Sequence, residues 1–501
     1  MKNKTGVCRA LLLVGMGLMI PCYLFTAGNT LLSPWPLYDR NRLALCLLTP
    51  LCLLLLLLLG RAAKAKVFET HERAVLLGFA AFYFVIQLVM ASALRFTPVT
   101  DLEQCVTAAR RLAQTGAFGD SERSLIYFGR YPHNMGLVYL LTGIFKAADA
   151  LGADELMAAA LVCGLLFSMG LLCAARLCRR LGGTQAQARA LLLFATCLPF
   201  LYCTSELYTD AFSVAFAPMI VFAFLKARDA GSRKERALWA LLFAVCTFFG
   251  AQIRFPTIIA AIACLIAALF EKRAKLTALL AAPLALVFAV GGSAVNAANE
   301  ANLGAANIAQ NKLPKLHYIA MGLPVQSDEG YGQYGYGGWL IFSTSFDDPQ
   351  ARDEALRQEV VDRAYTLAHH PAQLLSTLSR KNLSTFGRGT FNLNEIFEAD
   401  AHEADNAVKQ AAFENGRFNR AYTHLATAMF VAQMALACIA CIQAIRRRDT
   451  HAAPLFLTLL GAFLFLSIWE TRARYFFQFM MILLCAGAMF ETPSTHAAQK
   501  A

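Results

Sequence analysis

Acidic and basic side chains gather in short polar turns between long apolar stretches of this sequence. Asp101 and Glu103 directly follow one apolar stretch (TPVTDLEQ), Arg254 stands in a second turn (QIRFPT), and a third turn reads WETRARYF. Ionisable residues at the ends of membrane-spanning segments are costly, so their clustering needs a reason. A carboxylate beside arginines can take a proton from an acceptor hydroxyl while the arginines hold a phosphate leaving group. These residue types therefore suggest displacement from a lipid phosphate.

More polar residues belong to the same side of the expected membrane. Any one of them could be an ordinary helix-end charge that extends to water. Together, acids and arginines in turns this short indicate one polar cavity rimmed by lipid. The further candidates found from position alone are Arg130, His133, Glu206, Asp210, Glu470, Arg472 and Arg474.

The composition places these turns in a membrane protein. Of the 501 residues, 57% are hydrophobic and 16% are charged, and the mean hydropathy is +0.49. This is more apolar material than one soluble core can bury. Apolar runs long enough to cross a bilayer recur from Leu11 to Ala488, which excludes a soluble enzyme with one anchor, a disordered chain and a secreted disulfide scaffold. Because runs such as 51–59 are apolar on every side, the spanning elements are helices and not barrel strands.

The charge and the cysteines agree with this class. The net charge is +12, but the basic residues form short clusters at the ends of apolar runs, where they orient helices rather than bind nucleic acid. Most of the 15 cysteines lie inside apolar runs and predict no disulfide framework. The sequence has no dense cluster of carboxylates and histidines that would indicate a metal site.

Six basic clusters, at 2–4, 61–66, 176–180, 228–236, 272–275 and 446–448, predict one topology. All six face the cytoplasm when both termini are inside and about 12 helices cross the membrane. The predicted spans lie near 7–27, 44–60, 74–95, 156–178, 187–204, 208–226, 236–252, 255–270, 275–295, 421–444, 453–468 and 474–491. The apolar stretch 135–152 is then an interfacial or re-entrant helix on the outer side. We expect a multi-pass protein of the plasma membrane whose active site faces outward.

This topology divides the chain into five parts, which are N-terminal spans (1–95), a first external loop with interfacial helices (96–155), a transmembrane core (156–295), an external segment (296–420), and C-terminal spans with a cytoplasmic tail (421–501). In the second external segment, 349–369 and 371–386 each begin near a proline and have helical apolar spacing, which predicts two surface helices. The Gly- and Tyr-rich stretch 331–339 (YGQYGYGGW) is either a plain flexible loop or a mobile cover over a site.

Four short motifs follow one another on the outer side: TDLE at 100–103, YPHN at 131–134, YTD at 208–210 and ETRARY at 470–475. Their order and side resemble the GT-C superfamily of integral membrane glycosyltransferases, in its protein O-mannosyltransferase and aminoarabinose-transferase branch. The first motif is similar to that family's acidic first-loop motif, and the second to the start of its surface helix. The third is similar to the acidic motif before its next span, and the fourth to its C-terminal Arg-Tyr motif. In this chain Leu102 separates two acids that are commonly adjacent in the family, and two spans instead of one precede the span that leads into the loop.

The resemblance implies a GT-C-like fold and the transfer of a sugar, with inversion, from a polyprenyl-phosphate donor to a glycan, lipid or protein acceptor. It implies that Asp101 is the general base and Glu103 the second catalytic acid. It implies phosphate binding by Arg254, Arg472, Arg474 and Lys381, and orientation of donor or acceptor by His133 and Asp210. It implies no metal or other cofactor, and membrane lipids are the other expected partners. The remaining residues expected to contact substrate are Arg130, Tyr131, Asn134, Glu206, His317, Glu470 and Tyr475.

Two other functional classes stay open. A lipid-linked sugar transporter or flippase would use the same arginines, but it predicts polar residues along a path through the membrane. The middles of spans such as 188–201 and 255–268 are instead nearly free of charge, which favours a site at one face. A non-catalytic membrane biogenesis protein would need no site of its own.

Overall fold

The computed structural model describes residues 2–35, 41–63, 65–95, 97–119, 121–326, 329–393, 406–412 and 417–491, and all regular secondary structure within them is helical. A bilayer offers no water to backbone groups, and helices satisfy those groups internally. The predicted all-α polytopic fold class is therefore confirmed. Lys64 of one basic cluster, Phe96 and Asp120 of the first external loop, and parts of the segment 296–420 lie outside the described residues.

The first half of the chain contains α1 (Lys2–Gly17), α2 (Met19–Leu32), α3 (Arg42–Ala62), α4 (Ala65–Ala93), α5 (Thr100–Thr115), α6 (Glu122–Arg130), η1 (Pro132–Asn134), α7 (Met135–Ala150), α8 (Glu155–Ala195), η2 (Leu198–Leu201), η3 (Cys203–Ser205), α9 (Thr209–Ser213), α10 (Phe216–Asp229) and α11 (Arg233–Ile253). The second half contains η4 (Phe255–Thr257), α12 (Ile258–Phe270), α13 (Ala274–Leu303), α14 (Ala305–Asn311), α15 (Lys315–Gly322), α16 (Trp339–Thr344), α17 (Pro349–His369), α18 (Pro371–Phe386), α19 (Ala407–Ala412), α20 (Arg417–Arg446), α21 (Ala453–Ile468), α22 (Arg474–Phe477) and α23 (Met480–Ala488).

Within the described residues, 8 helices are long and apolar enough to cross a membrane. They are α1 with α2, α3, α4, α8, α9 with α10, α11, α13 and α20. Two shorter apolar helices, Phe255–Phe270 and Ala453–Ile468, correspond to further predicted spans. Leu47, Leu51 and Leu58 of α3 are exposed, as expected for a surface that faces lipid tails. The centre of the bundle is α10, whose residues are almost all buried.

Two predicted spans, 156–178 and 187–204, are the arms of one folded-back helix, α8. Gly183 interrupts it with a φ of +74°, a conformation that glycine adopts without a steric cost. Ser168 of the first arm donates a hydrogen bond to the carbonyl of Ala80 on α4 at 3.3 Å. The hydroxyl of Tyr83, one turn further along α4, donates to the carbonyl of Phe194 on the second arm at 2.9 Å. Both arms therefore run along the same stretch of α4.

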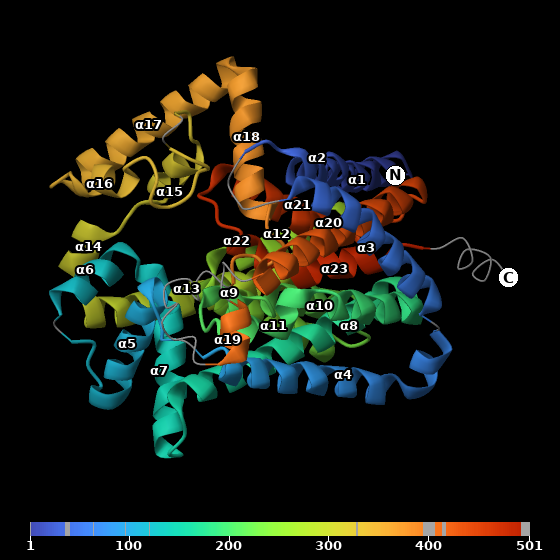
Figure 1. Ribbon diagram of the computed structural model, residues 1–501, viewed down its shortest axis with the longest axis horizontal. Coiled ribbons are helices and arrows are strands. Elements are labelled where there is room, and N and C mark those ends of the chain that lie inside the picture. The colour runs from blue at the N-terminus through green and yellow to red at the C-terminus, as the bar shows by residue number, and fades with distance from the viewer. Residues whose placement is uncertain are drawn as a thin grey trace.

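Figure 1 shows α5, α6, α7 and α14–α17 at one end of the bundle, while α1 begins at the opposite end. The bounds of α17 and α18 are those predicted from the sequence. Asp348 caps α17 by accepting hydrogen bonds from the backbone N–H groups of Gln350 and Ala351 at 2.9 and 3.3 Å. In the same view α7 runs across the direction of α4 and α8. The stretch predicted to be interfacial or re-entrant therefore does not run along the bundle.

Candidate active site

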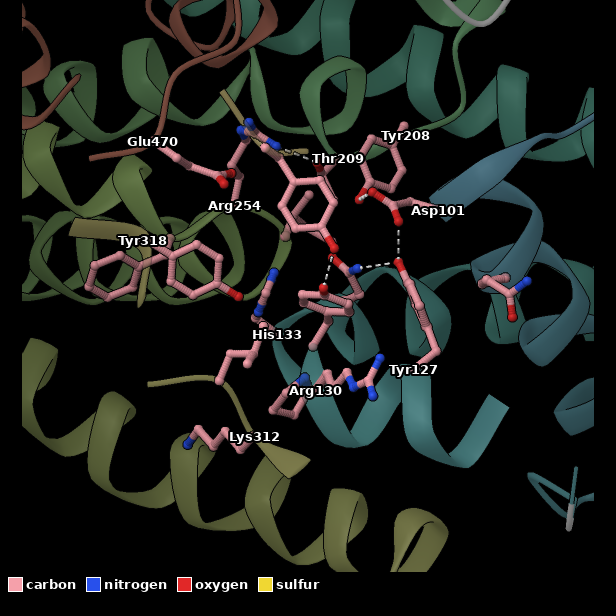
Figure 2. A pocket seen from close by; sticks show the side chains of 18 of the residues that line it. Asp101, Tyr127, Arg130, His133, Tyr208, Thr209, Arg254, Lys312, Tyr318 and Glu470 are labelled. Atoms are coloured by element: carbon pink, nitrogen blue, oxygen red, sulfur yellow. Dashed lines mark hydrogen bonds between the residues drawn. The ribbon is translucent and has the colours of Figure 1, made fainter. Parts of the chain in front are cut away.

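A cavity of about 1500 Å³ opens at this end of the bundle, between α5, α6, α15 and the turns that follow α11 and α21. Figure 2 shows side chains from these separate elements pointing toward one another. The polar turns that are far apart in the sequence therefore meet in one place. The predicted site residues that line the cavity are Asp101, Glu103, Arg130, Tyr131, His133, Asn134, Arg254, Glu470, Arg472, Arg474 and Tyr475.

Asp101 lies in the first turn of α5, and two tyrosines hold its carboxylate (Figure 2). The Tyr127 hydroxyl donates to Oδ1 at 2.7 Å, and the Tyr208 hydroxyl donates to Oδ2 at 3.4 Å. Asn134 Nδ2 donates to the Tyr127 hydroxyl at 2.9 Å and so orients it. No side-chain hydrogen bond caps α5, so Asp101 does not serve as the helix cap. Its oxygens are available as proton acceptors on the cavity wall.

The backbone just before Asp101 adopts a strained conformation. Thr100 has a φ of +53°, a left-handed conformation that β-branched residues rarely adopt. Such conformations persist where the surrounding structure fixes them, often at functional sites. Here the strained residue joins the extended backbone at Val99 to the first turn of α5, which places Asp101 at the cavity.

A buried aspartate joins two of the predicted phosphate-binding arginines. Arg254 Nε lies 3.1 Å from Asp210 Oδ1, and Arg474 Nε lies 3.5 Å from Asp210 Oδ2. Arg254 Nη1 also donates to Thr209 Oγ1 at 2.7 Å. Asp210 is fully buried and does not line the cavity, whereas both arginines do. The aspartate therefore fixes two arginines whose side chains reach the cavity wall.

Glu470 and Arg472 come from the turn after α21. The Tyr475 hydroxyl donates a hydrogen bond to Glu470 Oε1. Burial raises the pKa of Glu470 above its ordinary value, although the Tyr475 hydrogen bond and the charges of Arg474 and Arg472 act against this rise. Arg472 Nη2 donates to the carbonyl of Tyr334 at 3.2 Å. This turn thus adds the acid Glu470 and the cation Arg472 to the Asp210 pair, by which we mean Arg254 and Arg474 held by Asp210.

Aromatic rings form another wall of the cavity, next to His133. Tyr318 stacks on Trp469 with 5.1 Å between ring centroids, and Phe465 also stacks on Trp469 at the same spacing. Loss of solvation lowers the pKa of His133 to about 4; the charges of Arg254 and Lys312 act in the same direction, and the charge of Asp101 acts against it. His133 still touches the open volume of the cavity. It is therefore a neutral hydrogen-bonding group at neutral pH.

The Gly- and Tyr-rich stretch 331–339 lies over the rim of this cavity. The hydroxyls of Tyr334 and Tyr131 are 2.8 Å apart and hydrogen-bonded. The backbone N–H of Thr471 donates to the carbonyl of Gly332 at 2.8 Å. At the far end of the stretch, the Arg363 guanidinium lies 4.4 Å from the centre of the Trp339 ring. The stretch thereby contributes Tyr334 to the cavity wall, and its role as a mobile cover stays a prediction.

Four predicted site residues, the buried Asp210 among them, do not line the cavity. Glu206 is buried in the turn before α9. His317 is buried on α15, where Nδ1 lies 2.7 Å from the Ser343 hydroxyl and burial lowers its pKa to about 4. Lys381 is buried on α18, donates to the carbonyl of Gly322 and, at 2.7 Å, to that of Trp469, and burial lowers its pKa to about 7. Lys381 therefore supports the turn that carries Glu470.

Sequence reasoning missed several residues of the site. Tyr127 had a detectable signal, because the four-residue spacing places it beside Tyr131 at the end of a helix, where the two ring centroids are 5.1 Å apart. Lys312 and Lys315, which also line the cavity, flank Pro314 at the start of α15. No pattern predicted Tyr318 and Trp469. Within the described residues, no group of three or more His, Cys, Asp or Glu side chains could hold a metal ion.

Comparisons with known proteins place the chain among membrane proteins. The model of a family described as conserved hypothetical integral membrane protein matches residues 42–495. No curated protein matches the chain. Among solved structures, the crystal structure of ArnT from Cupriavidus metallidurans bound to undecaprenyl phosphate aligns with 83% of this chain and 78% of its own, at 13% identity and a TM-score of 0.36. An alignment at that TM-score supports no inference about this chain.

Proposed function

The chain belongs to the family described as conserved hypothetical integral membrane protein, and we propose that it is a glycosyltransferase. In this proposal it moves a sugar from a polyprenyl-phosphate-linked donor to an acceptor at the outer face of the membrane. One observation carries the proposal: a carboxylate held by two tyrosines and a pair of arginines fixed on a buried aspartate open on one cavity. The first group is suited to removing a proton, and the second to holding a phosphate leaving group.

The proposed reaction is a single displacement. The acceptor oxygen forms a bond to the anomeric carbon while the bond from that carbon to the phosphate oxygen breaks. The acceptor proton passes to Asp101, and the electron pair of the broken bond stays on the polyprenyl phosphate. Arg254 and Arg474 stabilise that developing charge. Because the acceptor attacks opposite the leaving phosphate, the configuration at the anomeric carbon inverts. Asp101 then loses the proton to water.

Other side chains support this step in distinct ways. Asp210 acts through the two arginines and is a positioning residue. Lys381 fixes the carbonyl of Trp469 and so positions Glu470. Glu103 lines the same cavity from the exposed side of α5 and is the second carboxylate within reach of a bound substrate. His133, neutral at neutral pH, is suited to hydrogen bonds with sugar hydroxyls.

The distribution of basic clusters supports an outward-facing cavity. No residue of the six clusters is among those that line the cavity. Arg180, for example, pairs with Asp229 at 3.0 Å where α10 ends, whereas the cavity lies at the N-terminal side of α9 and α10. Clusters of Lys and Arg mark the cytoplasmic ends of helices. A cavity at the other end therefore faces outward in this proposal.

Purified full-length protein in lipid nanodiscs, supplied with a radiolabelled polyprenyl-phosphate sugar and a membrane extract as the source of acceptor, tests the reaction. We expect label to move from the donor to acceptor material, and Asp101→Asn to stop this movement. Sealed proteoliposomes separate the transporter alternative. Donor that crosses the bilayer without being consumed would favour a transporter and contradict the proposed enzyme.

A further inference from the structure

A second group of cations lines the cavity away from the Asp210 pair. These four residues are Arg123, Arg130, Lys312 and Lys315, and we refer to them as the outer cation cluster. None of the four forms an ion pair with a carboxylate in the part of the chain that the structure describes. Glu103 and Glu300 also line the cavity but pair with none of them. By contrast, Arg254 and Arg474 share Asp210.

The segments that carry the outer cation cluster are bonded to each other. The backbone N–H of Leu313, which follows Lys312, donates to the carbonyl of Arg130 at 3.3 Å. Asn307 Nδ2 of α14 donates to the carbonyl of Leu125 on α6 at 2.9 Å. These bonds bring the last turn of α6 close to Lys312. Arg130 and Lys312 therefore belong to one wall of the cavity.

This wall is separate from the phosphate-binding arginines. Figure 2 shows Arg130 and Lys312 at one side of the site and Arg254 at the other, with His133 between them. Arg130 Nε is buried and has no hydrogen-bond acceptor among the described residues. The Lys315 ammonium lies 5.1 Å from the centre of the Phe255 ring. Arg123, Lys312 and Lys315 are exposed, whereas Arg130 is partly buried, and its buried Nε–H group is unfavourable unless a ligand supplies an acceptor.

We propose that the outer cation cluster binds a negatively charged group, a phosphate or a carboxylate, on the acceptor molecule. The inference rests on the proposed function, because it assigns Arg254 and Arg474 to the donor. The acceptor is then an anionic molecule whose reactive hydroxyl lies within reach of Asp101.

Direct binding tests the subsite without a known acceptor. The full-length protein, in nanodiscs of uncharged lipid, is first saturated with a polyprenyl phosphate that carries no sugar. Binding of radiolabelled inorganic phosphate is then measured. We expect one further phosphate per chain, with affinity weakened by about tenfold in Lys312→Gln and more in the Arg130→Gln/Lys312→Gln double variant, since hydrogen bonds to charged groups are the strong ones. Lys146→Gln, which removes an exposed lysine of α7 that does not line the cavity, should bind phosphate normally.

Three controls make the outcome decisive. Binding of the polyprenyl phosphate itself should be unchanged in Lys312→Gln, which shows that the variant is folded and that the donor site is separate. Phosphate binding that is absent, or equal in Lys312→Gln and Lys146→Gln, would overturn the proposal. If a polyprenyl diphosphate blocks phosphate binding and loses affinity in Lys312→Gln, the cluster serves the carrier and the proposal is wrong. None of these experiments measures sugar transfer. A protein that transfers no sugar would therefore contradict the proposed function, whereas the phosphate-binding result could still be interpreted.

Discussion

The Tyr127 hydroxyl donates a hydrogen bond to Asp101 Oδ1 across 2.7 Å, and this bond joins α6 to the start of α5 over 26 positions of sequence. Tyr127 in turn accepts a hydrogen bond from Asn134 Nδ2. A carboxylate oriented by such a chain is held in one geometry before substrate arrives, which is the condition for efficient proton transfer.

Replacing Tyr127 with Phe removes the hydroxyl and keeps the ring. We expect the turnover number for sugar transfer to fall by about tenfold, since a hydrogen bond to a charged group contributes about 1.5 kcal/mol, while the donor KM stays unchanged. The matched control is Tyr131→Phe, whose lost hydroxyl contacts Tyr334 and not Asp101. Equal turnover losses in the two variants would contradict a specific role of Tyr127 in orienting Asp101.

Replacing Asp101 with Asn keeps the size of the side chain and removes the proton acceptor. Turnover should fall by roughly two to four orders of magnitude, as for loss of a general base, with donor affinity largely retained. Glu103→Gln should have a smaller effect. Steady-state transfer and donor binding, measured on the same preparations, check both statements. Near-normal turnover of Asp101→Asn would remove this residue from the mechanism.

Replacing Arg474 with Ala should raise the donor KM by about ten- to a hundredfold, because a charge-assisted contact to phosphate is lost. Arg474→Lys should recover part of this, since a point charge replaces a planar fork with two donors. Arg472→Ala should act in the same direction. Arg357→Ala, in the exposed pair with Glu354 on α17, is the control and should leave the KM unchanged. Normal donor saturation in both the Arg472 and Arg474 variants would exclude this turn from phosphate binding.

Cysteine labelling tests the orientation of the cavity. In a background without the 15 native cysteines, a probe at Gln358→Cys on the exposed face of α17 should react in intact cells. A probe at Gly231→Cys, exposed between α10 and α11, should react only after the cytoplasm is opened, because it adjoins a basic cluster. The reverse pattern would overturn the topology and the outward-facing mechanism with it.

Lys381 predicts a pH dependence of stability. Burial lowers its pKa to about 7, although the charge of Glu470 acts against this, whereas an unfolded lysine titrates near about 10.4. Between these values the unfolded chain binds more protons than the folded chain, so the free energy of unfolding rises with pH. Below about pH 7 Lys381 is charged in both states, and burying this charge lowers the free energy of unfolding by its full amount.

The change that tests this is Lys381→Met, which removes the titrating group. Its thermal midpoint in detergent should increase less between pH 7 and pH 9.5 than that of the wild type, a window bounded by the folded and unfolded values given above. Lys146→Met, at an exposed position, should follow the wild type. An identical pH dependence in Lys381→Met and the wild type would show that Lys381 is not the group that titrates.

The amino-acid pattern determined the elements of this protein. Apolar runs predicted an all-α membrane protein, and Pro349 and Pro371 marked the starts of α17 and α18 correctly, because helix hydrogen bonds and apolar periodicity are local properties. The two arms of α8 could also be predicted, since two apolar runs indicated two spans. The end of the second arm could not be predicted, because the helix ends at Ala195 inside a continuous apolar stretch.

Only the tertiary structure decided which side chains meet. The polar turns were identified one by one, yet the attachment of Asp210 to both Arg254 and Arg474, and of Asp101 to Tyr127 and Tyr208, depends on how helices pack. Burial likewise separated Lys381 from the cavity although its charge had suggested a direct contact. The physical reason is that local sequence sets where a helix begins and which face is apolar, whereas the contacts of a polar side chain depend on helices that are remote in sequence.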